Sequence, residues 1–314
     1  MANKWMGDEL TVIFLILAAV ILLAVLIVAR RLASRKSGAT GAQAGHGEGA
    51  EATALSGAGK SGLRVIPGNA QHIGAREEQQ DAWCFSPIDN PEAIERHGVL
   101  AVLADGMGGF AMGGEAGRLA VQTMLSAYTG KTSDEPVPQA LERSLREAGR
   151  AVYELAKQHG LEWSVGTTLI AAAVKEGRLY WTSVGDSRIY LYRNGGLTQL
   201  TQDHVYANRL QERVRAGVMT QEEADTHPER QLLTSYLGIP KLVEIDANRE
   251  PLLLQAGDWI LLCSDGLYDV LSEPLLAEAV RLPPQRAAEY ILRQVLVWRR
   301  PYQDNATIAI LAYG

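Results

Sequence analysis

Apolar residues after position 63 fall mainly into short runs of strand length, bounded by glycine, asparagine or aspartate. Runs of this length predict buried β-strands. They occupy residues 99–104, 168–174, 179–184, 189–192, 259–263 and 306–312. The turn sequence Asn194-Gly195-Gly196 directly follows one run, and Glu176-Gly177 separates two others. Such turns are typical of hairpins, so the pattern favours antiparallel pairing.

Between these runs, apolar residues recur three and four positions apart, which predicts helices. One such series consists of Leu141, Leu145, Ala148, Val152 and Leu155. Segments 114–128 and 286–298 are also interpreted as helices. Strand hairpins interrupted by helices predict an α+β domain in which helices cover antiparallel sheets.

The N-terminal region has a different pattern, because residues 10–29 contain no charged side chain. A helix of this length spans a hydrocarbon core of about 30 Å. Basic residues follow the run directly, at Arg30, Arg31, Arg35 and Lys36. A cleaved signal peptide would have a shorter apolar run with its basic residues in front. We therefore predict a single transmembrane helix, with residues 1–9 outside the cell and the rest in the cytoplasm.

Residues 30–62 begin with basic side chains and continue as a stretch rich in Gly, Ala and Ser. Such a composition cannot bury a core and predicts a flexible linker. Residues 63–314 then form the predicted globular domain, with 24 Lys and Arg against 32 Asp and Glu. An acidic domain argues against nucleic acid as a partner. The two cysteines, Cys84 and Cys263, give no disulfide framework.

Three aspartates share one context, at positions where a predicted strand ends or begins. Asp105 follows 99–104 and precedes Gly106, Asp265 follows 259–263, and Asp304 precedes 306–312. A single Asp-Gly after a strand is usually a turn. Carboxylates gathered at strand ends, however, supply the oxygen ligands that Mg²⁺ and Mn²⁺ prefer. The joint pattern therefore predicts a site for a hard divalent cation.

Seven motifs, in order along residues 70–314, carry a resemblance to a known family. They are 74–82 (GAREEQQDA), 104–109 (ADGMGG) with 114–116 (GEA), 166–169 (GTTL), 185–188 (GDSR), 200–204 (LTQDH), 261–267 (LLCSDGL) and 304–307 (DNAT). In these motifs the chain resembles the PPM family of metal-dependent, type 2C serine/threonine protein phosphatases, in its bacterial form.

The resemblance implies a fold of two packed antiparallel sheets flanked by helices, with a binuclear Mn²⁺ or Mg²⁺ centre at one end. It implies that Asp105, the Gly106 carbonyl, Asp265 and Asp304 bind metal. Arg76 would grip the substrate phosphate, and Asp81 would hold waters at the metals. The implied activity is hydrolysis of phosphoserine and phosphothreonine in proteins by direct attack of a metal-activated water.

The chain also departs from the family pattern. Gln79 stands where the first motif usually has Asn, and no Asp lies between Asp134 and Asp186 to provide the usual ligand of a third metal. The resemblance therefore implies two metal ions but does not imply a third. Residues 206–238 match the family's mobile flap, and Asp186, Arg188, His204 and His227 are interpreted as structural rather than as ligands.

A second function class stays open at this stage. An inactive relative could serve as a membrane-tethered module that binds phosphoproteins without hydrolysing them. Such a protein would be expected to lose ligand aspartates, whereas Asp81, Asp105, Asp265, Asp304 and Arg76 are all present. Phosphorylated proteins, including a serine/threonine kinase at the membrane, are the expected partners.

Overall fold

The computed structural model describes residues 64–107, 112–297 and 301–314. All of them belong to one compact unit. The predicted membrane span at residues 10–29, the segment before it and the linker at 30–62 lie outside the described residues. Within the described ranges, none of the helices is long and apolar enough to cross a membrane.

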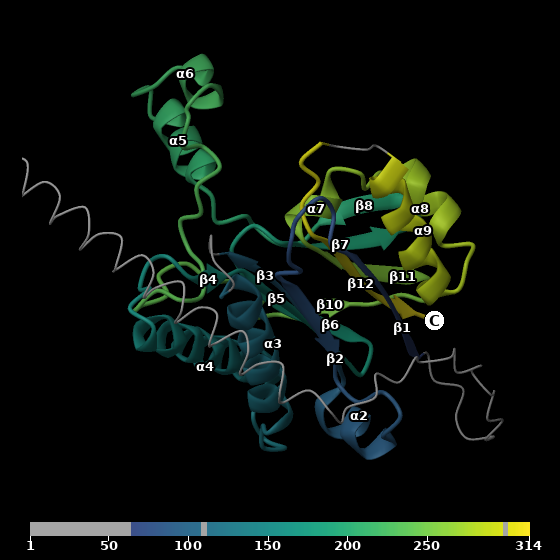
Figure 1. Cartoon of the computed structure of the whole chain (residues 1–314). Coiled ribbons are helices and arrows are strands. Elements are labelled where there is room, and N and C mark those ends of the chain that lie inside the picture. The colour runs from purple at the N-terminus through teal and green to yellow at the C-terminus, as the bar shows by residue number, and fades with distance from the viewer. Residues whose placement is uncertain (1–63, 108–111, 298–300) are drawn as a thin grey trace, which may run out of the picture. The chain divides into compact units, whose positions relative to one another are not determined.

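Two antiparallel sheets form the centre of the domain (Figure 1). One contains, in spatial order, β1 (Val65–His72), β12 (Ala306–Tyr313), β11 (Asp258–Cys263), β7 (Arg188–Arg193) and β8 (Gly196–Gln199). The other contains β10 (Leu252–Leu253), β6 (Arg178–Val184), β5 (Leu169–Lys175), β3 (Val99–Met107) and β2 (Asp81–Phe85), with β4 (Gly166–Thr167) on β3 and β9 (Asp246–Ala247) on β6. The predicted apolar runs lie in these strands, except that Thr168 lies between β4 and β5.

Both faces of the central strands are buried, which explains why they read as continuous apolar runs. Successive side chains of a strand point to opposite faces. On β3, Ala101 and Leu103 pack against Ile260 and Leu311 of the other sheet. Their neighbours Leu100 and Val102 pack toward helices instead. The alternation divides the core into one layer between the sheets and two layers under helices.

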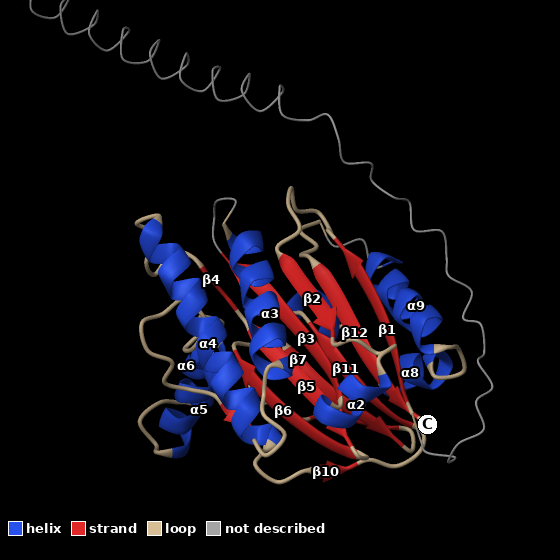
Figure 2. Ribbon diagram, turned by 90° about the horizontal axis from the view of Figure 1, so that it is seen from below, coloured by secondary structure: helices blue, strands red, loops and turns tan. Residues whose placement is uncertain are grey.

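Helices cover the outer face of each sheet, and Figure 2 shows them on opposite sides of the strands. The helices α3 (Gly113–Thr129) and α4 (Val137–Gln158) cover the sheet that contains β3. On the sheet that contains β11 lie α7 (Asp265–Tyr268), α8 (Glu273–Ala279) and α9 (Pro284–Val297). The short α2 (Pro91–His97) precedes β3. The predicted α+β sandwich of two antiparallel sheets between helices is confirmed.

An excursion between β8 and β9 carries α5 (Tyr206–Arg215) and α6 (Gln221–Asp225), which project from the body in Figure 1. Main-chain hydrogen bonds close its base, from the Tyr206 N–H to the Leu232 carbonyl and from the Thr234 N–H to the His204 carbonyl. This is the segment that the sequence matches to the family's flap.

The two ends of the described domain lie side by side. β1 pairs with β12 along its whole length, with Val65 opposite Tyr313 and His72 opposite Ala306. Close approach of α9 requires a glycine in β1, because a Cβ at Gly68 would overlap the main chain of Pro284. The chain therefore enters the domain at the Tyr313 end of this strand pair.

Candidate metal centre

Four aspartates, two from each sheet, meet at one end of the sandwich. Asp81 begins β2 and lies directly opposite Asp105 in the register of β2 and β3. In the other sheet, Asp265 begins α7 one residue beyond the end of β11, and Asp304 lies two residues before β12. Asp105, Asp265 and Asp304 line one cavity of about 350 Å³. The structure thus brings the predicted aspartates together.

The buried Asp81 carboxylate links the two sheets. Its Oδ2 accepts hydrogen bonds from the Ser264 hydroxyl at 2.8 Å and the Thr307 hydroxyl at 2.6 Å. Burial raises the pKa of Asp81 to about 6, the two hydroxyls oppose the rise, and the charges of Asp265 and Asp304 add to it. Among the described residues, no donor reaches its Oδ1.

Asp105 is held by the Gly-Thr-Thr motif, which explains that motif's place in the sequence. Its N–H donates to the Thr168 hydroxyl at 3.0 Å, and its carbonyl accepts from the Thr167 hydroxyl at 2.8 Å. Burial first, and then the surrounding aspartates, raise the pKa of Asp105 well above its usual range. Burial and the charge of Asp304 also raise the pKa of Asp265.

Gly106 is a position of close approach between β3 and the start of α3. A Cβ there would overlap the carbonyl of Gly113 and come within 2.8 Å of the Gln80 carbonyl oxygen. Any side chain would therefore push α3 away from the strand. The glycine keeps the main chain of residue 106 at the wall of the cavity.

Arg76 lies at the more exposed side of the cavity. Its Nη2 donates to Oδ2 of Asp304 at 2.6 Å, and both side chains are partly solvent-accessible. The loop that carries Arg76 is fixed by Asn305, whose Nδ2 donates to the carbonyls of Ile73 and Glu78. A cation for phosphate is therefore placed next to the carboxylate cluster.

Gln79 contributes a local contact in place of the usual Asn. Its Oε1 accepts the Asp81 N–H at 3.1 Å, a contact across two residues that fixes the main chain at the start of β2. The longer side chain thus supports Asp81 instead of displacing it.

The sequence analysis placed Ser264, Thr307, Thr168 and Asn305 inside its motifs but assigned no role to them. Each is adjacent to, or within three residues of, a predicted motif aspartate or motif glycine. Their neighbourhood was the available signal, but a lone hydroxyl or amide has no periodicity that sets it apart.

Asp186 also lines the cavity, and burial raises its pKa to about 6. Arg188 does not pair with it. The Arg188 guanidinium instead forms a bidentate ion pair with Asp203, with N–O distances of 3.0 and 2.7 Å. The guanidinium carbon also lies 3.7 Å from the ring centroid of Tyr268 in α7. Arg188 therefore braces the helix that begins with Asp265, which agrees with the structural interpretation.

The two predicted structural histidines make loop contacts. Nδ1 of the buried His204 accepts the Gly185 N–H at 3.0 Å. Nδ1 of His227 accepts the Glu229 N–H at 3.2 Å. Both nitrogens are thus used by main-chain donors, as expected for residues that are not metal ligands.

The donor set fits hard divalent cations. Buried carboxylates of like charge are costly unless a cation balances them. Among the described residues, Oδ1 of Asp81 and Oδ1 of Asp265 are buried without a hydrogen-bond donor. Oxygen ligands of this kind suit Mg²⁺ or Mn²⁺. Across residues 64–107, 112–297 and 301–314, no three Asp, Glu, His or Cys side chains already form a complete ligand geometry, so the fit rests on donor chemistry.

Comparisons with known proteins agree with this geometry. A family model described as "Protein phosphatase 2C" matches residues 69–298. The chain is 34% identical over 225 residues to the serine/threonine protein phosphatase PstP of Mycobacterium tuberculosis, covering 71% of this chain and 42% of that protein. It is 32% identical over 185 residues to the serine/threonine phosphatase stp of Listeria innocua, covering 58% of this chain and 71% of that protein.

A solved structure supports the fold and the cofactor class. The catalytic domain of PstP, in complex with two manganese ions, aligns with a TM-score of 0.61 and 27% identity, over 80% of this chain and 99% of that one. That likeness supports the prediction of a binuclear Mn²⁺ or Mg²⁺ site. From the family match and the shared fold, we conclude that this chain belongs to the protein phosphatase 2C family.

Proposed function

We propose that the chain is a metal-dependent protein phosphatase that hydrolyses phosphoserine and phosphothreonine. The observation that carries the proposal is the meeting of Asp81, Asp105, Asp265 and Asp304 from two sheets, with Arg76 beside them. The chain matches less than half the length of its mycobacterial relative. The activity named for that protein is therefore proposed for this chain.

In this proposal Asp105, the Gly106 carbonyl, Asp265 and Asp304 would hold two cations. When bound, these ions neutralise the phosphate dianion and lower the pKa of water. Arg76 orients the phosphate, because its planar guanidinium can pair with two oxygens at once. Asp81, which the Ser264 and Thr307 hydroxyls orient, would accept hydrogen bonds from waters at the metals.

The alternative of an inactive phosphoprotein-binding module has less support. It predicts the loss of a ligand or of the phosphate-binding cation. The carboxylates instead occupy one end of the sandwich, and Gln79 retains a contact to Asp81. The arrangement therefore favours the enzyme.

The test is phosphate release from a phosphothreonine peptide by the purified full-length chain. We expect release with Mn²⁺, none with EDTA, and a loss of roughly a hundredfold or more in Asp105→Asn, since even the outer partners of metal ligands contribute factors of that order. A folded protein that releases no phosphate with either Mn²⁺ or Mg²⁺ would leave the binding module as the better explanation.

We also propose a location and partners on the basis of sequence alone. Residues 10–29 would anchor the chain in the cell membrane as a single pass, with residues 63–314 in the cytoplasm. Its substrates would be phosphorylated proteins, including a membrane-bound serine/threonine kinase. Recovery of the full-length chain in the soluble fraction after cell lysis would refute the anchor, and crosslinking from membranes would identify the partners.

A further inference from the structure

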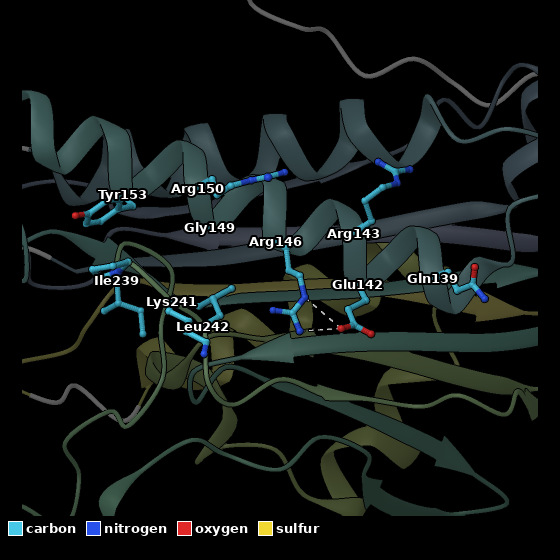
Figure 3. Close-up of a pocket in the computed structure, with 11 residues that line it drawn as sticks. Gln139, Glu142, Arg143, Arg146, Gly149, Arg150, Tyr153, Ile239, Lys241 and Leu242 are labelled. Carbon is cyan, nitrogen blue, oxygen red and sulfur yellow. Dashed lines mark hydrogen bonds and ion pairs between the residues drawn. The ribbon is translucent and has the colours of Figure 1, made fainter.

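A groove runs between α4 and the chain segment that follows α6. Its first part, about 520 Å³, lies between α4 and residues 239–242 (Figure 3). A second part of about 640 Å³ continues toward residues 243–249 and shares Gln139, Glu142 and Arg146 with the first. We call the two parts together the α4 groove. It does not include any of the aspartates of the candidate metal centre.

The α4 groove is built by tight packing at one point. A Cβ at Gly149 would come within 3.0 Å of the Leu242 Cδ1 atom. The glycine therefore lets Leu242 rest directly on α4, where it packs against the core under the helix. The chain on either side of Leu242 stays exposed at Lys241 and Val243 and forms the outer wall.

Basic side chains dominate the α4 groove, although residues 63–314 carry an excess of acidic ones. Two of the arginines are already balanced: Arg143 pairs with Glu135 and Glu147, and Arg146 pairs with Glu142. Figure 3 shows Arg146 and Glu142 directed toward each other on the side of α4 that faces the outer wall. These pairs leave other cations to give the groove its charge.

Three exposed cations of the groove, Arg150, Lys241 and Arg249, form no side-chain ion pair or hydrogen bond with another described residue. They lie on both walls, Arg150 on α4 and the other two on the facing segment. A ligand between the walls would therefore meet positive charge from two sides. The charge complementarity points to an anionic chain.

The outer wall of the α4 groove is connected through the chain to a residue that supports the candidate metal centre. Leu237, two residues before Ile239, exchanges two main-chain hydrogen bonds with Thr167, at 2.9 and 3.0 Å. The Thr167 hydroxyl in turn donates to the Asp105 carbonyl at 2.8 Å. The outer wall is also tied to α5, because Glu244 accepts from Arg209 at 2.6 Å and from Thr234 at 2.7 Å.

We propose that the α4 groove binds an extended acidic segment of the phosphoprotein substrate, outside the phosphorylated residue itself. From Pro136 to Tyr153 the helical wall measures about 26 Å, which about eight residues of extended peptide would span. A groove with cations on both walls suits an extended chain of carboxylates better than it suits a flat membrane surface. The inference rests on the proposed phosphatase activity.

The first test measures binding of a fluorescein-labelled octaglutamate peptide to the full-length chain by fluorescence anisotropy at low salt. The variant Arg150→Ala with Lys241→Ala removes two unpaired cations from the groove. A matched control, Arg96→Ala with Arg293→Ala, removes two exposed arginines that do not line it. We expect the dissociation constant to rise about fivefold in the groove variant, which corresponds to about 1 kcal/mol, and to change little in the control.

The second test connects the groove to turnover. A phosphothreonine peptide carries, through a long Gly/Ser linker, either eight Glu or eight Gln. We expect the Glu tail to lower KM about fivefold without changing kcat, and the groove variant to lose this difference. Hydrolysis of p-nitrophenyl phosphate should be the same in all three proteins.

The outcomes separate the two proposals. If p-nitrophenyl phosphate is not hydrolysed by any of the proteins, the phosphatase proposal fails while the anisotropy still tests the groove. Equal binding by the groove variant and the control, or no effect of the tail on KM, would overturn the groove proposal. Displacement of the label by glycerophosphoserine but not by unlabelled octaglutamate would assign the groove to lipid headgroups and overturn it as well.

Discussion

Thr307 and Ser264 donate to the same carboxylate oxygen, Oδ2 of Asp81, at 2.6 and 2.8 Å. Because Thr307 belongs to β12 and Asp81 begins β2, this shared acceptor joins the two sheets at the candidate metal centre. The orientation of Asp81 thus depends on a hydroxyl from the opposite sheet.

The first prediction follows from this contact. Thr307→Val keeps the shape of the side chain but removes the donor, so we expect kcat/KM for a phosphothreonine peptide to fall about ten- to hundredfold. Thr198→Val on the exposed face of β8 is the matched control. Unchanged activity in Thr307→Val would mean that Ser264 alone is enough to orient Asp81.

Gln79 provides a second prediction. Its Oε1 accepts the Asp81 N–H, and leucine would preserve most of its volume while removing the acceptor. We expect Gln79→Leu to lose about tenfold in kcat/KM, whereas Gln79→Asn, which keeps an acceptor, should lose less. The ratio of the two variants at equal Mn²⁺ concentration is the measurement. A larger loss in Asn than in Leu would contradict the proposed contact.

The third prediction concerns the effect of Gly106 on packing and stability. In Gly106→Ala the new methyl group meets the Gly113 carbonyl, so α3 has to move away from β3. We expect a loss of about 1–3 kcal/mol in the free energy of unfolding, measured by urea titration. Gly196→Ala is the control, because its nearest atom would lie 3.6 Å from the Cβ. Similar losses in the two variants would show that close approach is not the cause.

The fourth prediction concerns pH. Burial lowers the pKa of His204, and the neutral ring accepts the Gly185 N–H. The folded protein therefore binds fewer protons at this site than the unfolded chain. The contribution of His204 to stability is full above the ordinary histidine pKa of 6.5 and is lost as the pH falls below it. Glutamine at position 204 cannot titrate, so between pH 7 and 5.5 the unfolding free energy of His204→Gln should fall by about 1 kcal/mol less than that of the native chain.

The comparison of unfolding free energies at the two pH values isolates this histidine. His159→Gln is the control, since His159 is exposed at the end of α4. An equal pH dependence in His204→Gln and the native chain would show that His204 does not couple protonation to folding.

The sequence predicted those parts of the molecule that local pattern determines. Strands such as β3 and β12 are buried on both faces, so their composition alone identifies them. β1 was not predicted, because its sequence VIPGNAQH contains Pro and Gly and lacks alternation. Its conformation depends on β12 along one edge and on α9 packed at Gly68, and both contacts come from residues more than 200 positions away.

The candidate site also has parts that the sequence predicted and parts that it did not. The motif aspartates were predicted and lie together, whereas the contact between Arg76 and Asp304 and the sharing of Asp81 by two hydroxyls were not. These contacts join segments far apart in the chain, so no local spacing encodes them. The anchor at residues 10–29 stays a prediction.

The pairing of β1 with β12 places the candidate metal centre at one end of β1 and the entry of the chain at the other. The chain enters at Val65, opposite Tyr313, whereas His72, opposite Ala306, lies at the end of the strand next to Asp304. The seven steps between Val65 and His72 correspond to about 23 Å of strand. If the predicted anchor at residues 10–29 holds the chain, the candidate metal centre would therefore lie at the end of β1 opposite to the one where the chain enters the domain.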